Sequence, residues 1–326
     1  MTALVAYYLR DVDESAEPVQ ALKQQLHDIA LHEVAFELFR ANQLQTVLAA
    51  CREQGLQPLV IKGAALAQTH YPSPELRARC DADIFIDMAD IDRVQAIMQA
   101  QGYVVSGRIY KSHQFTCNLQ AAKSLSMTFD VHWRISNSPL FARSLSYQEA
   151  LDQSVEIDDD GNRGLSPVHA LLLACMHRAG NEEHDPDRLV WLYDMYLLVT
   201  GMGAEEQLAF AYLAQENGVQ DVCLEGIAKS SQYFNTGLSL EAVALLSDNS
   251  YSVTGSASLK NSYLGLVLDD LRNLKSWHAR YGLIHELLFP SSDELLRKYN
   301  KESSLWLPWL YTRYLSTGLL QRLRLR

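Results

Sequence analysis

The chain contains the segment Leu76-Arg77-Ala78-Arg79-Cys80-Asp81-Ala82-Asp83-Ile84-Phe85-Ile86. Its second half predicts a buried strand that begins at a pair of acids. Residues i and i+2 of a strand point to the same face, so Asp81 and Asp83 project side by side, with Cα atoms roughly 7 Å apart. Two carboxylates so close repel each other, which raises the pKa of at least one of them. A divalent cation relieves that repulsion, and magnesium prefers one or two carboxylates completed by phosphate oxygens and water.

A later apolar strand supplies a third acid, in the segment Phe129-Asp130-Val131-His132-Trp133. Asp130 and His132 share one face of this strand. A carboxylate in an apolar strand is costly to bury unless it is paired or binds a metal. If this strand lies beside the first one, Asp130 completes a three-carboxylate cluster, and a two-metal site needs acids from more than one strand.

Each signal also has an ordinary structural interpretation. A lone Asp-x-Asp pair is common in surface turns, and a lone strand Asp often accepts a structural hydrogen bond. We interpret His132 as a packed, hydrogen-bonded residue rather than a metal ligand, and Trp191 as part of a helical core. The combination of signals within one short segment favours a site.

A glycine turn lies upstream of the acids. Leu59-Val60-Ile61 is a short apolar run that ends at Lys62-Gly63, ahead of a predicted helix over Ala64–His70. A glycine here lets backbone N–H groups approach a phosphate, and the helix N-terminus adds partial positive charge. Lys62 could contact the phosphate, although the segment could also be an ordinary strand-to-helix turn.

Periodicity around these segments predicts an α+β fold. A long helix is expected over 16–54 and an amphipathic helix over 90–101, with strands at 59–61, 82–86, 103–109, 114–119 and 126–135. After the acidic turn at 158–162, helices are predicted at 167–180, 186–200, 204–217, 220–234, 239–247, 258–276 and 303–321. We therefore expect a small mixed-sheet domain at 56–136, an N-terminal helical segment at 1–55 and a large all-helical C-terminal region at 137–326.

Composition limits the classes of partner and compartment. The chain has 326 residues, 48% of them hydrophobic, and a formal net charge of −11, which disfavours a nucleic-acid partner. Its five cysteines are widely spaced with no CxxC pair, which argues against a zinc cluster or a disulfide framework. No basic leader and no run of about 18 apolar residues is evident, so we expect a cytoplasmic protein.

The C-terminus is aromatic and basic: Leu305-Trp306-Leu307-Pro308-Trp309-Leu310-Tyr311 precedes several arginines. We favour a helix packed on the body with a solvated basic tail. Peripheral contact with a membrane surface is the alternative.

Four stretches of the chain together resemble the uncharacterised nucleotidyltransferases of the polymerase-β-like superfamily. They are residues 59–66, Tyr71-Pro72, Arg77 four residues before Asp81, and residues 129–133. The resemblance covers residues 56–135 well and extends weakly over 166–199. Members often look like accessory enzymes of bacterial polysaccharide biosynthesis. One departure is that the superfamily often has Gly-Ser or Gly-Gly where this chain has Gly63-Ala64.

The resemblance implies a role for each matching residue. Asp81, Asp83 and Asp130 would be catalytic and hold Mg²⁺, and Asp130 could also assist the acceptor hydroxyl. A second set would bind the nucleotide, namely Lys62, Gly63, Ala64 and Arg77.

The function that the resemblance implies is the Mg²⁺-dependent transfer of a nucleoside monophosphate from an NTP to an unknown hydroxyl acceptor, which could be a small molecule, a glycan or a protein. The alternatives are a glycosyltransferase that uses an Asp-x-Asp motif, and a degenerate module that binds nucleotides or proteins without turnover. For the enzyme, we expect Asp83→Asn to abolish transfer and to leave metal-free stability unchanged or slightly higher.

Overall fold

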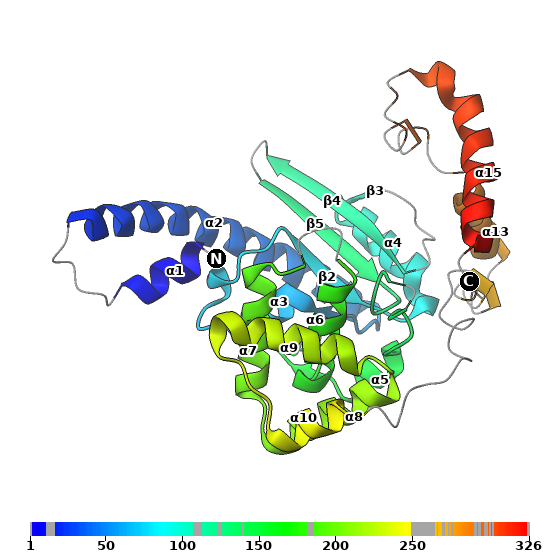
Figure 1. Cartoon of the computed structure of the whole chain (residues 1–326). Coiled ribbons are helices and arrows are strands. Elements are labelled where there is room, and N and C mark those ends of the chain that lie inside the picture. Colours follow the sequence, from blue (N-terminus) through cyan, green and yellow to red (C-terminus); the bar gives the residue numbers. More distant parts are fainter. Residues whose placement is uncertain are drawn as a thin grey trace.

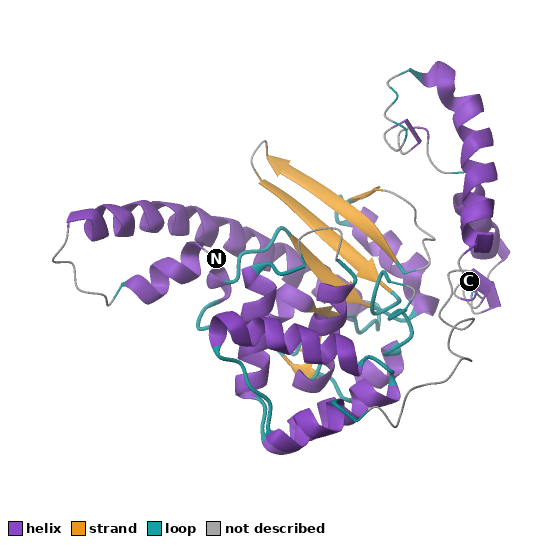
Figure 2. Ribbon diagram, viewed as in Figure 1, coloured by secondary structure: helices purple, strands orange, loops and turns teal. Residues whose placement is uncertain are grey.

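The structure is a computed structural model. It describes residues 2–10, 17–106, 113–122, 125–138, 140–181 and 186–248, together with parts of 265–324. Helices surround one central sheet (Figure 2), which confirms the predicted α+β class.

The sheet has seven strands among the described residues, in the order β3-β4-β5-β2-β1-β7-β6. The strands are β1 (Leu59–Ile61), β2 (Asp81–Phe85), β3 (Val104–Ser106), β4 (Gln114–Ala122), β5 (Leu125–His132), β6 (Val155–Glu156) and β7 (Arg163–Gly164). β2 runs parallel to β5 and antiparallel to β1, so the sheet is mixed, as expected. β7 pairs in parallel with β1, so the sheet also takes in a short hairpin from the otherwise helical region after residue 136.

The two faces of the sheet are buried against different helices because strand residues alternate between faces. Val60, Ala82 and Ile84 belong to a core shared with helices α2 and α4. Leu59, Ile61 and Phe85 belong to a second core, shared with the helices that follow the sheet in sequence. Asp81 and Asp83 alternate with Ala82 and Ile84 and therefore point to the second side, toward the later helices.

The first side is covered by the N-terminal part of the chain. Helix α2 spans Glu17–Glu53, close to its predicted range, and its C-terminal half buries Leu44, Val47 and Leu48 beneath the sheet. Helix α4 (Ile91–Ala100) packs in the same core. The short helix α1 (Thr2–Leu9) was not predicted and lies along the N-terminal half of α2 (Figure 1).

The second side is covered by a helical bundle. The bundle comprises α6 (Pro167–Ala179), α7 (Leu189–Gly201), α8 (Ala204–Glu216), α9 (Gln220–Phe234) and α10 (Leu240–Leu246), with α5 (Tyr147–Asp152) beside it. Ser166 caps α6 by accepting a hydrogen bond from the His169 amide, and Pro167 follows it, which is the predicted start signal. Helix α3 (Lys62–Thr69) lies between the sheet and this bundle (Figure 1).

Two further helices, α13 (Trp277–Leu288) and α15 (Leu307–Arg324), lie to one side of the body (Figure 1). The helix α13 was not predicted, whereas α15 corresponds to the helix expected at 303–321. The helix predicted over 258–276 falls for the most part outside the described residues. In the described part of the chain, no helix combines the length and the apolar character needed to cross a bilayer.

Candidate active site

The three predicted acids lie on adjacent strands and line one cavity. β2 and β5 are parallel neighbours, and their register pairs Asp83 with Asp130 and Asp81 with Thr128. Paired residues on neighbouring strands share a face, so all three carboxylates point to the helical side of the sheet. They line a cavity of about 410 Å³, which is within the usual size range of small-molecule sites.

Asp83 is the centre of a charged network. Lys62 donates from Nζ to Asp83 Oδ1 at 2.5 Å, and His132 Nε2 lies 2.9 Å from the same oxygen. Burial disfavours the charged carboxylate, yet the Lys62 ammonium and the His132 hydrogen bond hold the pKa of Asp83 well below its usual range. Asp83 is therefore ionised, and Lys62 is its counter-ion.

His132 is fully buried at the inner end of this network. Burial, and then the Lys62 charge, lower its pKa, so the imidazole is neutral at neutral pH and donates from Nε2 to Asp83. Its Nδ1 has no hydrogen-bond partner within the described part of the chain. The structure agrees with the interpretation of His132 as a packed, hydrogen-bonded residue, and the hydrogen bond joins it to the acid Asp83.

Asp81 and Asp130 complete the acidic cluster. Burial, and then repulsion from Asp83 and Asp130, raise the pKa of Asp81 to about 6, the effect that we expected of close carboxylates. Thr116 donates from its hydroxyl to Asp130 Oδ1 at 2.6 Å and so fixes that carboxylate. One ligand atom each from Asp83, Asp130 and His132 lie within 4.8 Å of one another, so these three residues could hold a metal ion.

The turn before helix α3 is strained at Lys62. Its φ of +55° lies in the left-handed region, which among the described non-glycine residues only Asn235 shares. Such a conformation is costly for a residue with a Cβ and is found mainly where function requires it. Here it turns the extended Ile61 directly into α3, whose first residues, Lys62 and Gly63, line the cavity.

Gly63 is needed because an arginine lies against it. A Cβ at position 63 would lie 3.0–3.2 Å from the Arg77 guanidinium. That guanidinium is buried and donates to Asp194 from Nε (2.9 Å) and Nη2 (2.7 Å), and from Nη1 to the Ala78 carbonyl (2.7 Å). Arg77 therefore lines the cavity, but its guanidinium donates to Asp194 and the Ala78 carbonyl, and in this way it holds the turn in place.

Asp194 is the partner that the sequence-based site did not include. It comes from α7 and also accepts a hydrogen bond from the Tyr71 hydroxyl at 2.8 Å. The signal that could have identified Asp194 from sequence is a carboxylate within the apolar segment Leu189–Gly201. Ala64, by contrast, is buried in the core shared with α2 and α4, so a hydroxyl added there would lie within that core.

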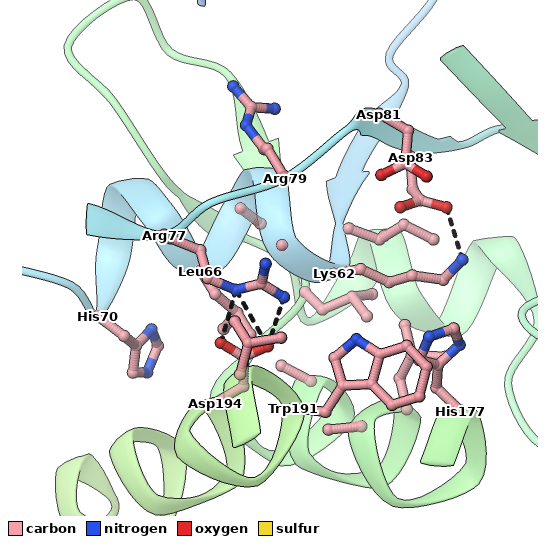
Figure 3. A pocket seen from close by; sticks show the side chains of 18 of the residues that line it. Lys62, Leu66, His70, Arg77, Arg79, Asp81, Asp83, His177, Trp191 and Asp194 are labelled. Carbon is pink, nitrogen blue, oxygen red and sulfur yellow. Dashed lines mark hydrogen bonds and ion pairs between the residues drawn. The ribbon is translucent and has the colours of Figure 1, made fainter. Parts of the chain in front are cut away.

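The wall opposite the acids comes from α6 and α7. His177 and Trp191 lie across the cavity from Lys62 and Asp83 (Figure 3). Their rings meet edge to face with centroids 4.6 Å apart, and the Arg188 guanidinium lies 4.8 Å from the Trp191 ring centroid. Burial, and then the Lys62 charge, lower the pKa of His177 to about 3, so this ring is neutral. Trp191 thus faces the cavity, contrary to its interpretation as a core residue.

Comparison with known proteins identifies one family. A family model described as an uncharacterised nucleotidyltransferase matches residues 1–235. No curated protein matches the chain. The matched range includes the acidic cluster, the Lys62-Gly63 turn, Asp194 and the α6–α7 wall, and it ends at the end of α9, before the two C-terminal helices.

Proposed function

The chain belongs to the family of uncharacterised nucleotidyltransferases, and on this basis we propose that it transfers a nucleoside monophosphate from an NTP to a hydroxyl acceptor with Mg²⁺. The acceptor oxygen attacks the α-phosphorus, the bond to the pyrophosphate breaks, and pyrophosphate leaves. The observation that carries the proposal is the in-register pair Asp83 and Asp130, which faces a cavity beside the Lys62-Gly63 turn.

The donor set fits a divalent metal. It consists of two carboxylates and a neutral imidazole within 4.8 Å, and Asp81 lines the same cavity. We assign Asp81, Asp83 and Asp130 as the metal-holding acids. His132 can join them as a ligand through Nε2 only in the other tautomer, with its proton on Nδ1, because Nε2 otherwise donates to Asp83. When bound, the metal would neutralise phosphate charge and polarise the phosphoryl oxygen.

We assign four of the chain's residues to the nucleotide, namely Lys62, Gly63, Ala64 and Arg77. Lys62 and the N-terminus of α3 supply positive charge on the side of the cavity next to Asp83, where a triphosphate would meet the acids. Arg77 acts on the nucleotide indirectly, because it fixes Gly63 through its ion pair with Asp194. The Ala64 amide belongs to the same helix N-terminus.

Asp130 is the carboxylate that we assign to the acceptor. Thr116 holds its Oδ1, and a fixed carboxylate at the cavity edge can take the proton of the attacking hydroxyl. The opposite wall, with Trp191, His177 and Arg188, would select the acceptor. The net charge of −11 disfavours a nucleic-acid acceptor and favours a small molecule, a glycan or a protein.

The family resemblance favours a cytoplasmic role in bacterial polysaccharide biosynthesis. We assign catalysis to residues 56–136, with support from the helical segments 1–55 and 137–326. A nucleotide-binding module without turnover is the second candidate, because the turn has Gly63-Ala64 where the superfamily often has Gly-Ser or Gly-Gly.

A transfer assay tests the proposal. Purified protein is incubated with α-labelled NTPs, Mg²⁺ and fractionated cell extract, and label that becomes attached to an acceptor is measured. Transfer by the wild type that is absent for Asp130→Asn and in EDTA supports the enzyme. Metal-dependent NTP binding without transfer to any fraction would favour the binding module instead.

A further inference from the structure

The two C-terminal helices carry a surface that the proposed function does not use. We define the C-terminal arm as residues 277–324, which include α13, α15 and the short 3₁₀ turn Ser304–Trp306. The family match ends at residue 235. The role of the arm must therefore be argued from its own residues.

The arm buries aliphatic residues and leaves its tryptophans outside. Leu310 and Tyr314 of α15 pack against Leu295 in a small core, and Leu283 of α13 packs with Leu274 next to Met88 of the body. A helix packed on the body would be expected to bury its largest apolar side chains as well. The helices of this arm leave theirs exposed.

Three of the five tryptophans in the chain lie in the arm and are exposed. Trp277 is 81% exposed, and Trp306 and Trp309 are each nearly half exposed. Tyr281 lies four residues after Trp277 on the same face of α13 and is also exposed. Tryptophan and tyrosine are the residues enriched where protein meets the headgroup region of a bilayer.

Each of these tryptophans has a cation over its ring. Arg280 lies 5.1 Å from the Trp277 ring centroid, and Lys301 lies 4.9 Å from that of Trp306. The Arg313 guanidinium lies 5.1 Å from the Trp309 centroid. Paired aromatic rings and cations suit an anionic lipid interface, where rings enter the headgroup region and cations meet phosphates.

The arm also differs from the rest of the chain in net charge. The arm, residues 277–324, contains seven Lys and Arg against four Asp and Glu, a net charge of +3, whereas the whole chain has −11. An anionic surface therefore repels the body and attracts the arm. This asymmetry argues against an arm-to-arm contact between two copies of the chain, because two basic arms repel each other.

We propose that the C-terminal arm docks the protein on the surface of an anionic phospholipid bilayer. The contact is interfacial, since no helix within the described residues is long and apolar enough to span. The exposed tryptophans supply apolar contact, and the basic residues supply attraction to headgroups, roughly fivefold in binding for each cation near the surface.

Vesicle flotation of the full-length protein tests the proposal without nucleotide or metal. The probes are phosphatidylcholine vesicles with and without phosphatidylglycerol. Wild type is expected to float with the anionic vesicles, and added salt is expected to release it. The double variant Trp277→Ser, Trp309→Ser should bind about tenfold more weakly, and Tyr212→Ser, an exposed aromatic of α8, should bind as wild type does.

Three results would overturn the proposal. Wild type could fail to float with anionic vesicles, it could float equally with neutral ones, or Tyr212→Ser could weaken binding as much as the tryptophan variant. Sedimentation velocity on the same samples identifies the competing occupant. A dimer that the tryptophan variant abolishes, without vesicle binding by wild type, would assign the surface to a second copy of the chain.

Discussion

Asp81 and Asp83 of β2 have different surroundings, although the two acids look equivalent in the sequence. Asp83 has Lys62 as a counter-ion and a hydrogen bond from His132. Burial and two neighbouring carboxylates disfavour the charged form of Asp81. The repulsion predicted from the Asp-x-Asp spacing therefore acts on Asp81, and the expectation that Asp83→Asn would leave metal-free stability unchanged is revised below.

Asp81→Asn and Asp83→Asn should shift metal-free stability in opposite directions. The folded-state pKa of Asp81 is about 6, above its ordinary value of 3.8. The folded protein thus holds an extra proton between these values, and stability falls as pH rises from about 4 to about 6. Asp81→Asn removes this loss and should gain about 3 kcal/mol at pH 7, with little change near pH 4.

Asp83→Asn should instead lose about 3 kcal/mol at pH 7, because it leaves the largely buried Lys62 ammonium without its carboxylate. Urea unfolding in EDTA at pH 4 and pH 7 measures both variants. Equal effects of the two substitutions at pH 7 would contradict the assignment of Lys62 as the counter-ion of Asp83.

Gly63 is required for space rather than for backbone freedom. An added Cβ meets the Arg77 guanidinium at 3.0–3.2 Å, and Arg77 cannot retreat without stretching its bonds to Asp194. Gly63→Ala should therefore cost about 1–2 kcal/mol and weaken NTP binding. Gly237→Ala, where nothing lies within 4 Å of an added Cβ, is the matched control. If Gly63→Ala left both the stability and the NTP affinity unchanged, that result would contradict the role of Arg77 in the site.

At the scale of elements, the sequence predicts the long and strongly patterned ones. The helix expected at 16–54 is observed at Glu17–Glu53, and the strand expected at 59–61 is observed there. The Ser166-Pro167 signal starts α6. These succeed because cap chemistry and periodicity are local properties.

The elements that the sequence missed depend on tertiary contacts. β6 and β7 have two residues each, too few for any period, and exist because β7 pairs with β1. In the site, Asp194 is more than a hundred residues from Arg77 in sequence, and only the packing of α7 brings them together. His132 was visible in sequence, but its hydrogen bond to Asp83 depends on the register of β2 with β5.

The Arg77–Asp194 pair joins the segment before β2 to helix α7, and breaking it should loosen both. Asp194→Asn leaves the buried Arg77 guanidinium without its carboxylate, which should cost about 3–4 kcal/mol. Arg77→Lys should also destabilise, since an ammonium cannot make the same paired contact. A double-mutant cycle between the two positions, measured by urea unfolding, should show strong coupling. Additive effects would show that the pair does not link the two elements.

At the scale of the whole molecule, the sheet and the helical bundle build one site between them. The sheet contributes the acids, the turn before α3 contributes Lys62 and Gly63, and α6 and α7 contribute the opposite wall. The sequence predicts the first two parts because their motifs are short. It does not identify the residues of the third, because α6 and α7 show a helical pattern that does not indicate which side chains face the sheet.

The central claim is that these acids form a joint site for metal and nucleotide. Calorimetric titration of NTP into wild type, Asp83→Asn and Asp221→Asn, each with Mg²⁺ or EDTA, tests it most directly. Asp221 is an exposed acid of α9 and serves as the control. We predict Mg²⁺-dependent NTP binding for wild type and Asp221→Asn, weakened at least tenfold by EDTA or by Asp83→Asn. The same NTP affinity for all three proteins in both buffers would contradict a metal–nucleotide site at these residues.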